Sequence, residues 1–192
     1  MKKKYTAIIL SKQSDRTVRT GVGRFAYVHL DEAYAQNPQD KPKYSLTFMF
    51  DKNDKQALKV LEEAIENATQ KGIEKFGKSF NGKKFHNPIN DGDEKEDEEY
   101  EGFYYMNIKN THRPVCYDQK REEMSAEDIY SGCYGRCVVE FYPFNRAGNT
   151  GVAASLKSVQ FLGDGKPLAG GVKSTAEDFD DDNDGADDGM LD

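Results

Sequence analysis

The sequence predicts a mainly β domain, a small closed or partly open barrel with one inserted helix and long loops. Two observations predict it: several short segments alternate apolar and polar residues, and one segment carries apolar residues at helical spacing. A third observation sets the boundary, because periodicity stops beyond Gly170 and acidic residues take over. We expect one domain over residues 1–172 and a disordered acidic tail over residues 173–192. A sandwich-like arrangement of the same strands stays open.

The first strand is expected over residues 18–30, with two faces of different character. The positions expected to face the core are Val18, Thr20, Val22, Ala26, Val28 and Leu30. The opposite face carries Arg19, Gly21, Gly23, Phe25, Tyr27 and His29. Basic, aromatic and glycine residues are an unusual choice for a face that only meets water. Because Arg24 interrupts the apolar alternation, we predict a bulge near Gly23.

A second strand and the helix follow. The strand covers residues 44–50 and points Leu46, Phe48 and Phe50 inward. Asn53 is the expected helix N-cap, with Gln56 three residues later as in a capping box. The apolar residues at helical spacing, which we assign to core packing, are Leu58, Leu61, Ile65 and Ala68, with Phe76 as an extension.

Three further strands are predicted beyond a long connection over residues 77–101. They cover residues 103–109, 132–142 and 152–162, and a hairpin turn over residues 145–151 joins the last two. The glycines at 163 and 165 end the last strand.

The charge of the chain is divided between a basic body and two acidic segments. The whole chain has 27 Lys+Arg and 34 Asp+Glu, a net charge of −7. Residues 176–192 hold nine acids and no base, and residues 91–101 hold eight acids and one base. Without both segments, 26 basic residues face 17 acidic ones, a net charge of +9. A basic surface attracts polyanions, and an acidic tail can compete for it.

Three predicted strands combine cations and aromatic rings on one face. Single-stranded nucleic acid needs this combination, because cations follow the phosphates and rings stack on unpaired bases at roughly 1–3 kcal/mol per base. With two lysines on a covering loop, the candidate nucleic-acid-binding residues are Arg19, Phe25, Tyr27, Lys83, Lys84, Tyr105, Lys109, Tyr134, Arg136 and Tyr142. Each of them alone is also an ordinary outward residue of an antiparallel strand.

The acidic tail has three interpretations. It can be a solubilising segment. It can bind calcium, since Asp180, Asp182, Asp184 and Gly185 match the start of an EF-hand loop, but Leu191 stands where a bidentate Glu is needed. We favour a regulatory tail that covers the basic groove and docks partner proteins when DNA displaces it. The residues expected to dock are Phe179, Asp180, Asp181, Asp182, Met190 and Leu191.

A zinc site is conceivable from His112, Cys116, Cys133 and Cys137. In one regular strand, however, Cys133 and Cys137 would lie roughly 13 Å apart, so we interpret them as core residues. We predict no metal and no cofactor. The chain has three cysteines, no signal peptide and no apolar run of membrane length, which indicates a reduced cytoplasmic protein.

An enzyme would have to use the acidic run. Asp91, Asp93 and Glu94 could hold Mg²⁺ as in a nuclease, but the run continues through Glu99 as a solvated strip. No Ser-His-Asp, Cys-His or P-loop arrangement is present. We therefore predict no enzymatic activity. The alternatives left open are a metal-dependent nuclease or nuclease subunit using the Asp91–Glu99 cluster, and a DNA-mimicking module that binds another protein's basic surface.

An ordered set of segments resembles phage and prophage single-stranded DNA-binding proteins, long grouped as a domain of unknown function. The segments are Asn90–Glu94, Tyr100, Gly102, Arg113-Pro114, Tyr130–Arg136, Phe141-Tyr142, Gly148-Asn149, Gly151–Ala153, Val159–Phe161 and Asp164-Gly165. The resemblance covers about Tyr5 to Leu168 and implies an OB-fold-like five-stranded barrel, sequence-tolerant binding of single strands and no catalysis. The tail is similar to the partner-docking tails of such proteins, although it closes on Met190-Leu191-Asp192 in place of the common Pro-Phe.

The sequence thus predicts a protein that coats single-stranded DNA in phage replication or recombination. We expect it in the cytoplasm of the bacterial host, with replication or recombination proteins as tail partners. Binding of RNA stays open, because stacking and phosphate contacts do not distinguish the sugar. A homo-oligomer also stays open.

Overall fold

Five strands close into a ring in the computed structural model, which describes residues 5–168. They are β3 (Gly23–Tyr34), β4 (Lys43–Asp51), β6 (Phe103–Asn110), β8 (Tyr134–Arg146) and β9 (Asn149–Gly163). The pairs β8–β3, β3–β4, β4–β6 and β8–β9 are antiparallel, and a parallel β6–β9 contact closes the ring. This confirms the mainly β, OB-fold-like arrangement with an inserted helix.

The parallel contact that closes the ring is short. Its register has one pair, Lys109 with Ser155. The Asn110 side chain reinforces it by donating from Nδ2 to the Leu156 carbonyl at 2.8 Å. The ring is therefore partly open between β6 and β9.

Short elements extend the ring. β1 (Ile8–Ile9) pairs with β2 (Thr17–Arg19), which in turn pairs with β8. β5 (Asn90–Asp91) pairs with β6. β7 (Val115–Tyr117) runs parallel to β9. The 3₁₀ turns are η1 (Lys78–Asn81), η2 (Gly92–Glu94), η3 (Glu98–Tyr100) and η4 (Ala126–Asp128). Residues 77–101 are thus largely irregular, as expected.

The segment predicted as one strand over residues 18–30 is two strands, and its alternation changes phase twice. The first change lies between β2 and β3, so Val22 is 41% exposed and Phe25 is fully buried, the reverse of the prediction. Gly135 makes room for this ring, since a Cβ there would lie 2.4 Å from Phe25 Cζ. The second change is a register shift after Ala26, where Tyr27 has φ +46°. The bulge therefore lies at Tyr27 and not near Gly23.

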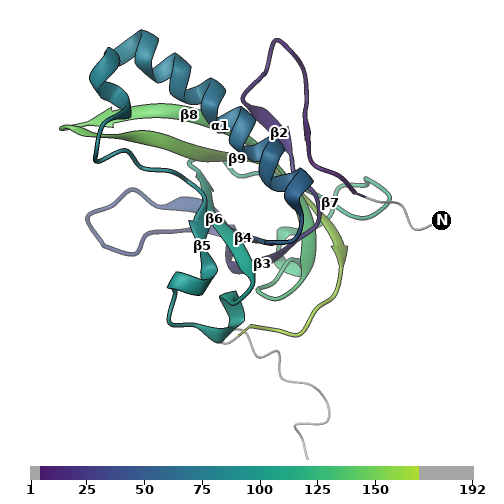
Figure 1. The fold of residues 1–192 in the computed structure, drawn as a ribbon. Coiled ribbons are helices and arrows are strands. Elements are labelled where there is room, and N and C mark those ends of the chain that lie inside the picture. The colour runs from purple at the N-terminus through teal and green to yellow at the C-terminus, as the bar shows by residue number, and fades with distance from the viewer. Residues whose placement is uncertain (1–4, 169–192) are drawn as a thin grey trace, which may run out of the picture.

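The one α-helix within residues 5–168, α1 (Lys55–Phe76), runs along the long β8–β9 hairpin (Figure 1). Asp54 caps it, because its Oδ1 accepts from the Ala57 amide at 3.0 Å; the predicted cap, Asn53, was one residue early. Gln56 instead donates to the Ala7 carbonyl at 2.7 Å and ties the helix to the N-terminal segment. The expected stripe is buried at Leu61, Ile65 and Ala68, and Leu58 packs against the core.

The β8–β9 hairpin turns at Ala147 and Gly148, which have φ +49° and +84°. Two consecutive positive φ values are typical of the tight turn whose twist fits a hairpin, which confirms the predicted turn. Leu46, Phe48 and Phe50 from β4 lie in the main core with Cys133, Cys137 and Cys116. Among residues 5–168, no helix has the length and apolar character needed to cross a membrane.

Candidate nucleic-acid interface

The outer face of β3, β4 and β6, which we call the outer face, is built from three rows of opposed residues. One row joins Arg24, Met49 and Tyr105, the next Ala26, Thr47 and Asn107, and the third His29, Ser45 and Lys109. Thr47 Oγ1 donates to Asn107 Oδ1 at 2.8 Å and fixes the middle row. Since alternate residues of a strand share a face, the residues between these rows, such as Phe48 and Met106, point into the core.

A tyrosine cluster lies at one end of the outer face, formed by Tyr27, Tyr100 and Tyr105. Lys95 reaches over it, with Nζ 3.5 Å from the Tyr100 ring centroid and 5.4 Å from those of Tyr27 and Tyr105. Lys95 is the one base in the acidic run of residues 91–101. A cation held over rings can meet a phosphate while an adjacent ring meets a base.

Tyr27 is the most accessible ring of the cluster. Its side chain is 58% exposed, and its backbone has φ +46°, which is uncommon for a bulky residue. Bulges of this kind re-aim side chains and recur beside functional sites. The bulge turns the Tyr27 ring away from the core, where the ring can stack on a base.

The opposite end of the outer face is basic. Burial lowers the pKa of Lys43, and the nearby charges of Lys109 and Arg146 lower it further. We call these three residues the basic end. At the basic end, His29 lies in the row of Lys109 and Tyr34 pairs with Lys43, and their rings stack at 4.4 Å with 11° between their planes. Burial lowers the pKa of His29, which favours the neutral imidazole.

The described chain ends on the same face. Leu168 is 4% exposed and packs in a small apolar cluster with Ala26, Met49 and Tyr100. Its amide donates to the Ser131 carbonyl at 3.0 Å. In Figure 1 the end of the coloured ribbon lies beside the 3₁₀ turns that carry Tyr100. The acidic tail itself, with its predicted docking residues, lies outside the described residues, and the described chain ends at Leu168, beside the tyrosine cluster.

The ten predicted binding residues do not share one surface. Tyr27, Tyr105 and Lys109 lie on the outer face. Arg19 and Arg136 lie together on another wall of the ring, formed by β2, β7, β8 and β9. Tyr134 is 41% exposed and pairs across strands with Arg24, at the border between the two walls.

The prediction that Phe25 binds nucleic acid is wrong. It is fully buried in the main core, 6.2 Å from the Phe48 ring, and cannot stack on a base without unfolding β3. The alternation placed it on the outer side because the break between β2 and β3 is not visible in the pattern.

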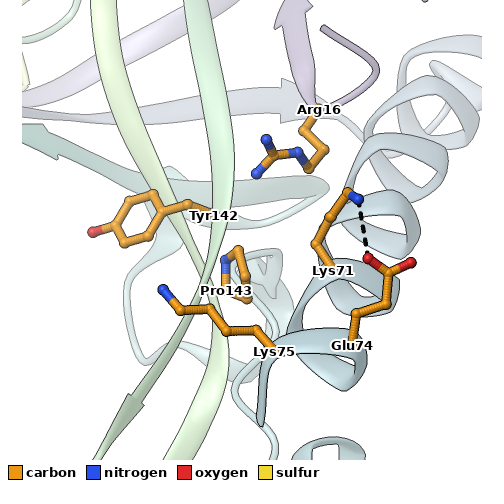
Figure 2. A pocket seen from close by; sticks show the side chains of 6 residues that line it. All are labelled: Arg16, Lys71, Glu74, Lys75, Tyr142 and Pro143. Carbon is orange, nitrogen blue, oxygen red and sulfur yellow. Dashed lines mark hydrogen bonds and ion pairs between the residues drawn. The ribbon is translucent and has the colours of Figure 1, made fainter. Parts of the chain in front are cut away.

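Tyr142 lies apart from the other candidates, beside a groove between α1 and β8. Figure 2 shows Lys71, Glu74 and Lys75 of α1 near Pro143, with the Tyr142 ring pointing away from Lys71. Lys71 is paired with Glu74 at 3.0 Å. Arg16 also lines the groove, so three cations stand against one acid and the groove is basic, but it lies apart from the outer face.

Lys83 and Lys84 are exposed in the segment between η1 and His86. His86 pairs with Gly151 of β9, and its ring lies 6.1 Å from that of Phe144. These contacts place the segment beside the β8–β9 hairpin. No contact among residues 5–168 joins the two lysines to the outer face, and their predicted covering role stays a prediction.

Sequence reasoning missed Lys43, Lys95, His29, Tyr34 and Arg146. Lys95 could have been found in the sequence, because it is the one base among eight acids. The basic end could not, because its three residues come from three segments far apart in the chain.

The first two acids of residues 91–101 form ion pairs within the fold. Lys52 Nζ pairs with both Asp91 and Asp93, and Asp93 Oδ1 also accepts from the Gly102 amide at 2.7 Å. The hydrogen bond from Lys52 lowers the pKa of Asp91, and the Gly102 amide followed by Lys52 lowers that of Asp93. Within the described chain, no three His, Cys, Asp or Glu side chains are placed to hold a metal ion.

The three cysteines are core residues, as the strand spacing predicted. All are free and buried, and burial raises the pKa of Cys116 and of Cys133 to about 11. His112, the fourth member of the conceivable zinc set, is exposed and lies near Asn110 and Thr111. The set does not converge.

Comparison with known proteins identifies the family. A family profile described as the single-stranded DNA-binding protein of Enterobacter phage Enc34 matches residues 16–191. The chain belongs to this family. A curated relative, putative protein p50 of Acyrthosiphon pisum secondary endosymbiont phage 1, is 33% identical over 165 residues, 82% of this chain and 89% of the relative. The resemblance inferred from the ordered segments is confirmed.

Solved structures agree with the family. The single-stranded DNA-binding protein of bacteriophage Enc34, in complex with ssDNA, has a TM-score of 0.72 and 26% identity, covering 88% of this chain and 96% of that one. The single-stranded DNA-binding protein gp2.5 of bacteriophage T7 has a TM-score of 0.58 and 15% identity, covering 89% and 98%. The second likeness concerns the fold alone.

Proposed function

We propose that this protein binds single-stranded DNA without sequence preference and has no enzymatic activity. The observation that carries the proposal is the outer face, with rings at one end and three converging cations at the other. Rings stack on any base and cations follow any phosphate, so binding of this kind tolerates sequence. In an OB-fold the face of the second and third strands, here β4 and β6, is the usual place for such a strand. The Enc34 relative, described as bound to ssDNA, adds support.

The acidic tail is proposed to compete with DNA and to dock replication or recombination proteins. The supporting observation is the position of Leu168, which packs beside Tyr100 at the tyrosine cluster. Residues 176–192 hold nine acids, and a tether to the face gives them a high effective concentration there. We place the protein in the cytoplasm of a phage-infected bacterium, during replication or recombination of phage DNA.

The first experiment is fluorescence anisotropy of a labelled oligothymidine of about 30 nucleotides. Full-length protein and a variant lacking residues 176–192 are titrated, with unlabelled duplex as competitor. We expect salt-sensitive binding that duplex does not compete, tighter at low salt without the tail. Equal affinity of the two variants would contradict tail competition, and no binding by either would favour the DNA-mimicking module.

A matched pair of tyrosines tests the face itself. Tyr27→Ala removes an exposed ring from the tyrosine cluster, and Tyr142→Ala removes one that lies away from the outer face, near the α1–β8 groove. Loss of one base stack corresponds to roughly 1–3 kcal/mol, or about 5- to 150-fold in Kd. We expect this loss for Tyr27→Ala and less than about twofold for Tyr142→Ala. Equal effects would refute the assignment of the face.

The nuclease alternative has a separate test. Incubation of labelled single strands with Mg²⁺ should leave them intact, because Asp91 and Asp93 are engaged by Lys52. Magnesium-dependent cleavage that Asp91→Ala with Asp93→Ala abolishes would overturn the non-enzymatic proposal.

A further inference from the structure

A pocket on the wall formed by β2, β7, β8 and β9 collects three arginines. It has a volume of about 260 Å³, and Arg19, Arg121 and Arg136 line it with Tyr117, Ser158 and Gln160. We call it the arginine pocket. No acidic side chain lines it, so the positive charge is not compensated within the pocket.

Arg19 has an unused donor. Its Nε is buried and has no hydrogen-bond partner among residues 5–168. The residue is held in β2, opposite Val138 of β8 and Ile8 of β1, so its backbone cannot move away easily. A buried polar atom without a partner is costly and is rare unless a ligand or ordered water completes the site.

Arg136 is held in a fixed orientation. Its Nε donates to Gln160 Oε1 at 2.7 Å, and Gln160 Nε2 donates to the Asp118 carbonyl at 2.8 Å, which sets the direction of the amide. The Tyr5 ring stacks on the guanidinium at 4.6 Å. Both terminal nitrogens of Arg136 are left without a protein acceptor in the described chain. A guanidinium fixed in this way presents a ready fork to a planar or tetrahedral oxyanion.

No ion pair joins the three arginines to an acid among residues 5–168. Asp118 lies in the turn beside Arg121, and its Oδ1 accepts from the amides of Lys120 and Glu122 at 2.8 and 2.9 Å. Burial lowers the pKa of Arg136, and the charges of Arg19 and Arg121 lower it further. Like charges brought together without a counter-ion are unfavourable, and a bound anion relieves that cost.

We propose that the arginine pocket binds a backbone phosphate of a single strand that also contacts the outer face. The arginines supply the fork geometry for a phosphate, and Tyr117 and Tyr5 supply rings beside it for the adjoining nucleoside. Arg24 and Tyr134 lie at the border of the two walls and give the strand a route between them. The proposal rests on the proposed function and extends it, because a strand would need more nucleotides to reach both walls.

The test compares short and long strands. Arg19→Gln with Arg136→Gln removes two charges from the pocket, and Lys55→Gln with Lys59→Gln removes two from exposed positions of α1 as a matched control. Each variant, with and without residues 176–192, is titrated with oligothymidines of about 8 and about 30 nucleotides. Melting temperatures confirm folding, and Arg121→Gln, in an exposed turn, replaces the double variant if that one fails to fold.

We expect the pocket variant to bind the long strand about tenfold more weakly at low salt, with a salt slope smaller by about 1.4, and the short strand within about twofold of the unsubstituted protein. The control should change neither. Unchanged binding of the long strand, or an equal loss for both lengths, would overturn the proposal. Stronger binding seen only when the tail is present would show that the pocket holds tail carboxylates.

A second probe separates this proposal from the proposed function. Inorganic pyrophosphate should raise the melting temperature of the unsubstituted protein and of the control, but not that of the pocket variant. If no oligonucleotide binds and this difference is seen, the proposed function fails while the phosphate site stands. If pyrophosphate stabilises all variants equally, the site is refuted.

Discussion

Removing charge from the basic end should weaken DNA binding without weakening the fold. The perturbation is Lys43→Gln with Lys109→Gln. Lys109 on β6 is exposed and lies opposite Ser45 of β4, and half-buried Lys43 is two residues from Ser45 on the same side of β4. Burial and the charges of Lys109 and Arg146 lower the pKa of Lys43, so the native state disfavours its charged form. We therefore expect an unchanged or slightly higher melting temperature.

The magnitude follows from counterion release. For a strand of about 8 nucleotides that contacts only the outer face, with Lys43, Lys95, Lys109 and Arg146 each on one phosphate, the slope of log K against log salt is about −2.8. Affinity then falls about 50-fold between roughly 50 and 200 mM salt. The double variant should have a slope near −1.4 and lose only about sevenfold over the same range.

The assay is anisotropy of a labelled oligothymidine at several salt concentrations, on protein lacking residues 176–192 so that the tail does not contribute. Lys55→Gln with Lys59→Gln on α1 is the charge-matched control. A slope that stays at the unsubstituted value in the basic-end variant, or that falls equally in the control, would refute the reasoning that phosphates contact this end of the face.

Three further predictions concern stability and the thiols. Gly72→Ala on α1 should destabilise the protein by about 1 kcal/mol in urea unfolding, because the new Cβ would lie 2.1 Å from the buried Phe80 ring and overpacking outweighs the gain in helix propensity; a gain in stability would show that the ring can move aside. Lys52→Gln should lower the melting temperature at pH 6, and the difference from the unsubstituted protein should vanish as the pH falls toward about 2. The reason is that Asp91 and Asp93 have lowered pKa values, so their contribution to stability is lost when they are protonated. A difference in melting temperature that does not depend on pH would exclude the ion pairs as its cause. The thiols of Cys116 and Cys133, with pKa values of about 11, should react with a thiol reagent at pH 8 only after unfolding in urea, and rapid labelling of the native protein would contradict their burial.

The separation of a basic body from acidic segments was visible in the sequence, but its use was not. Composition shows that residues 91–101 carry eight acids and one base. The fold gives these residues different tasks, because Asp91 and Asp93 hold Lys52 while Lys95 covers the tyrosine cluster. Which charge meets which partner depends on contacts between distant segments, and a one-dimensional pattern does not contain them.

The sequence by itself determined the long strands β4, β6, β8 and β9, the helix and the hairpin turn. Alternation and helical spacing are local properties, so Leu46, Phe48 and Ile65 were placed in the core correctly. The tertiary structure alone decided the phase of β3, where a break and a bulge reverse the faces and bury Phe25. It also decided how the cations are shared between two walls, because the pairing of β4 with β6 brings Lys43 near Lys109 and the pairing of β2 with β8 brings Arg19 near Arg136. Alternation within one strand sets the side on which each residue lies, whereas the residues that form a site depend on which strands pair with one another.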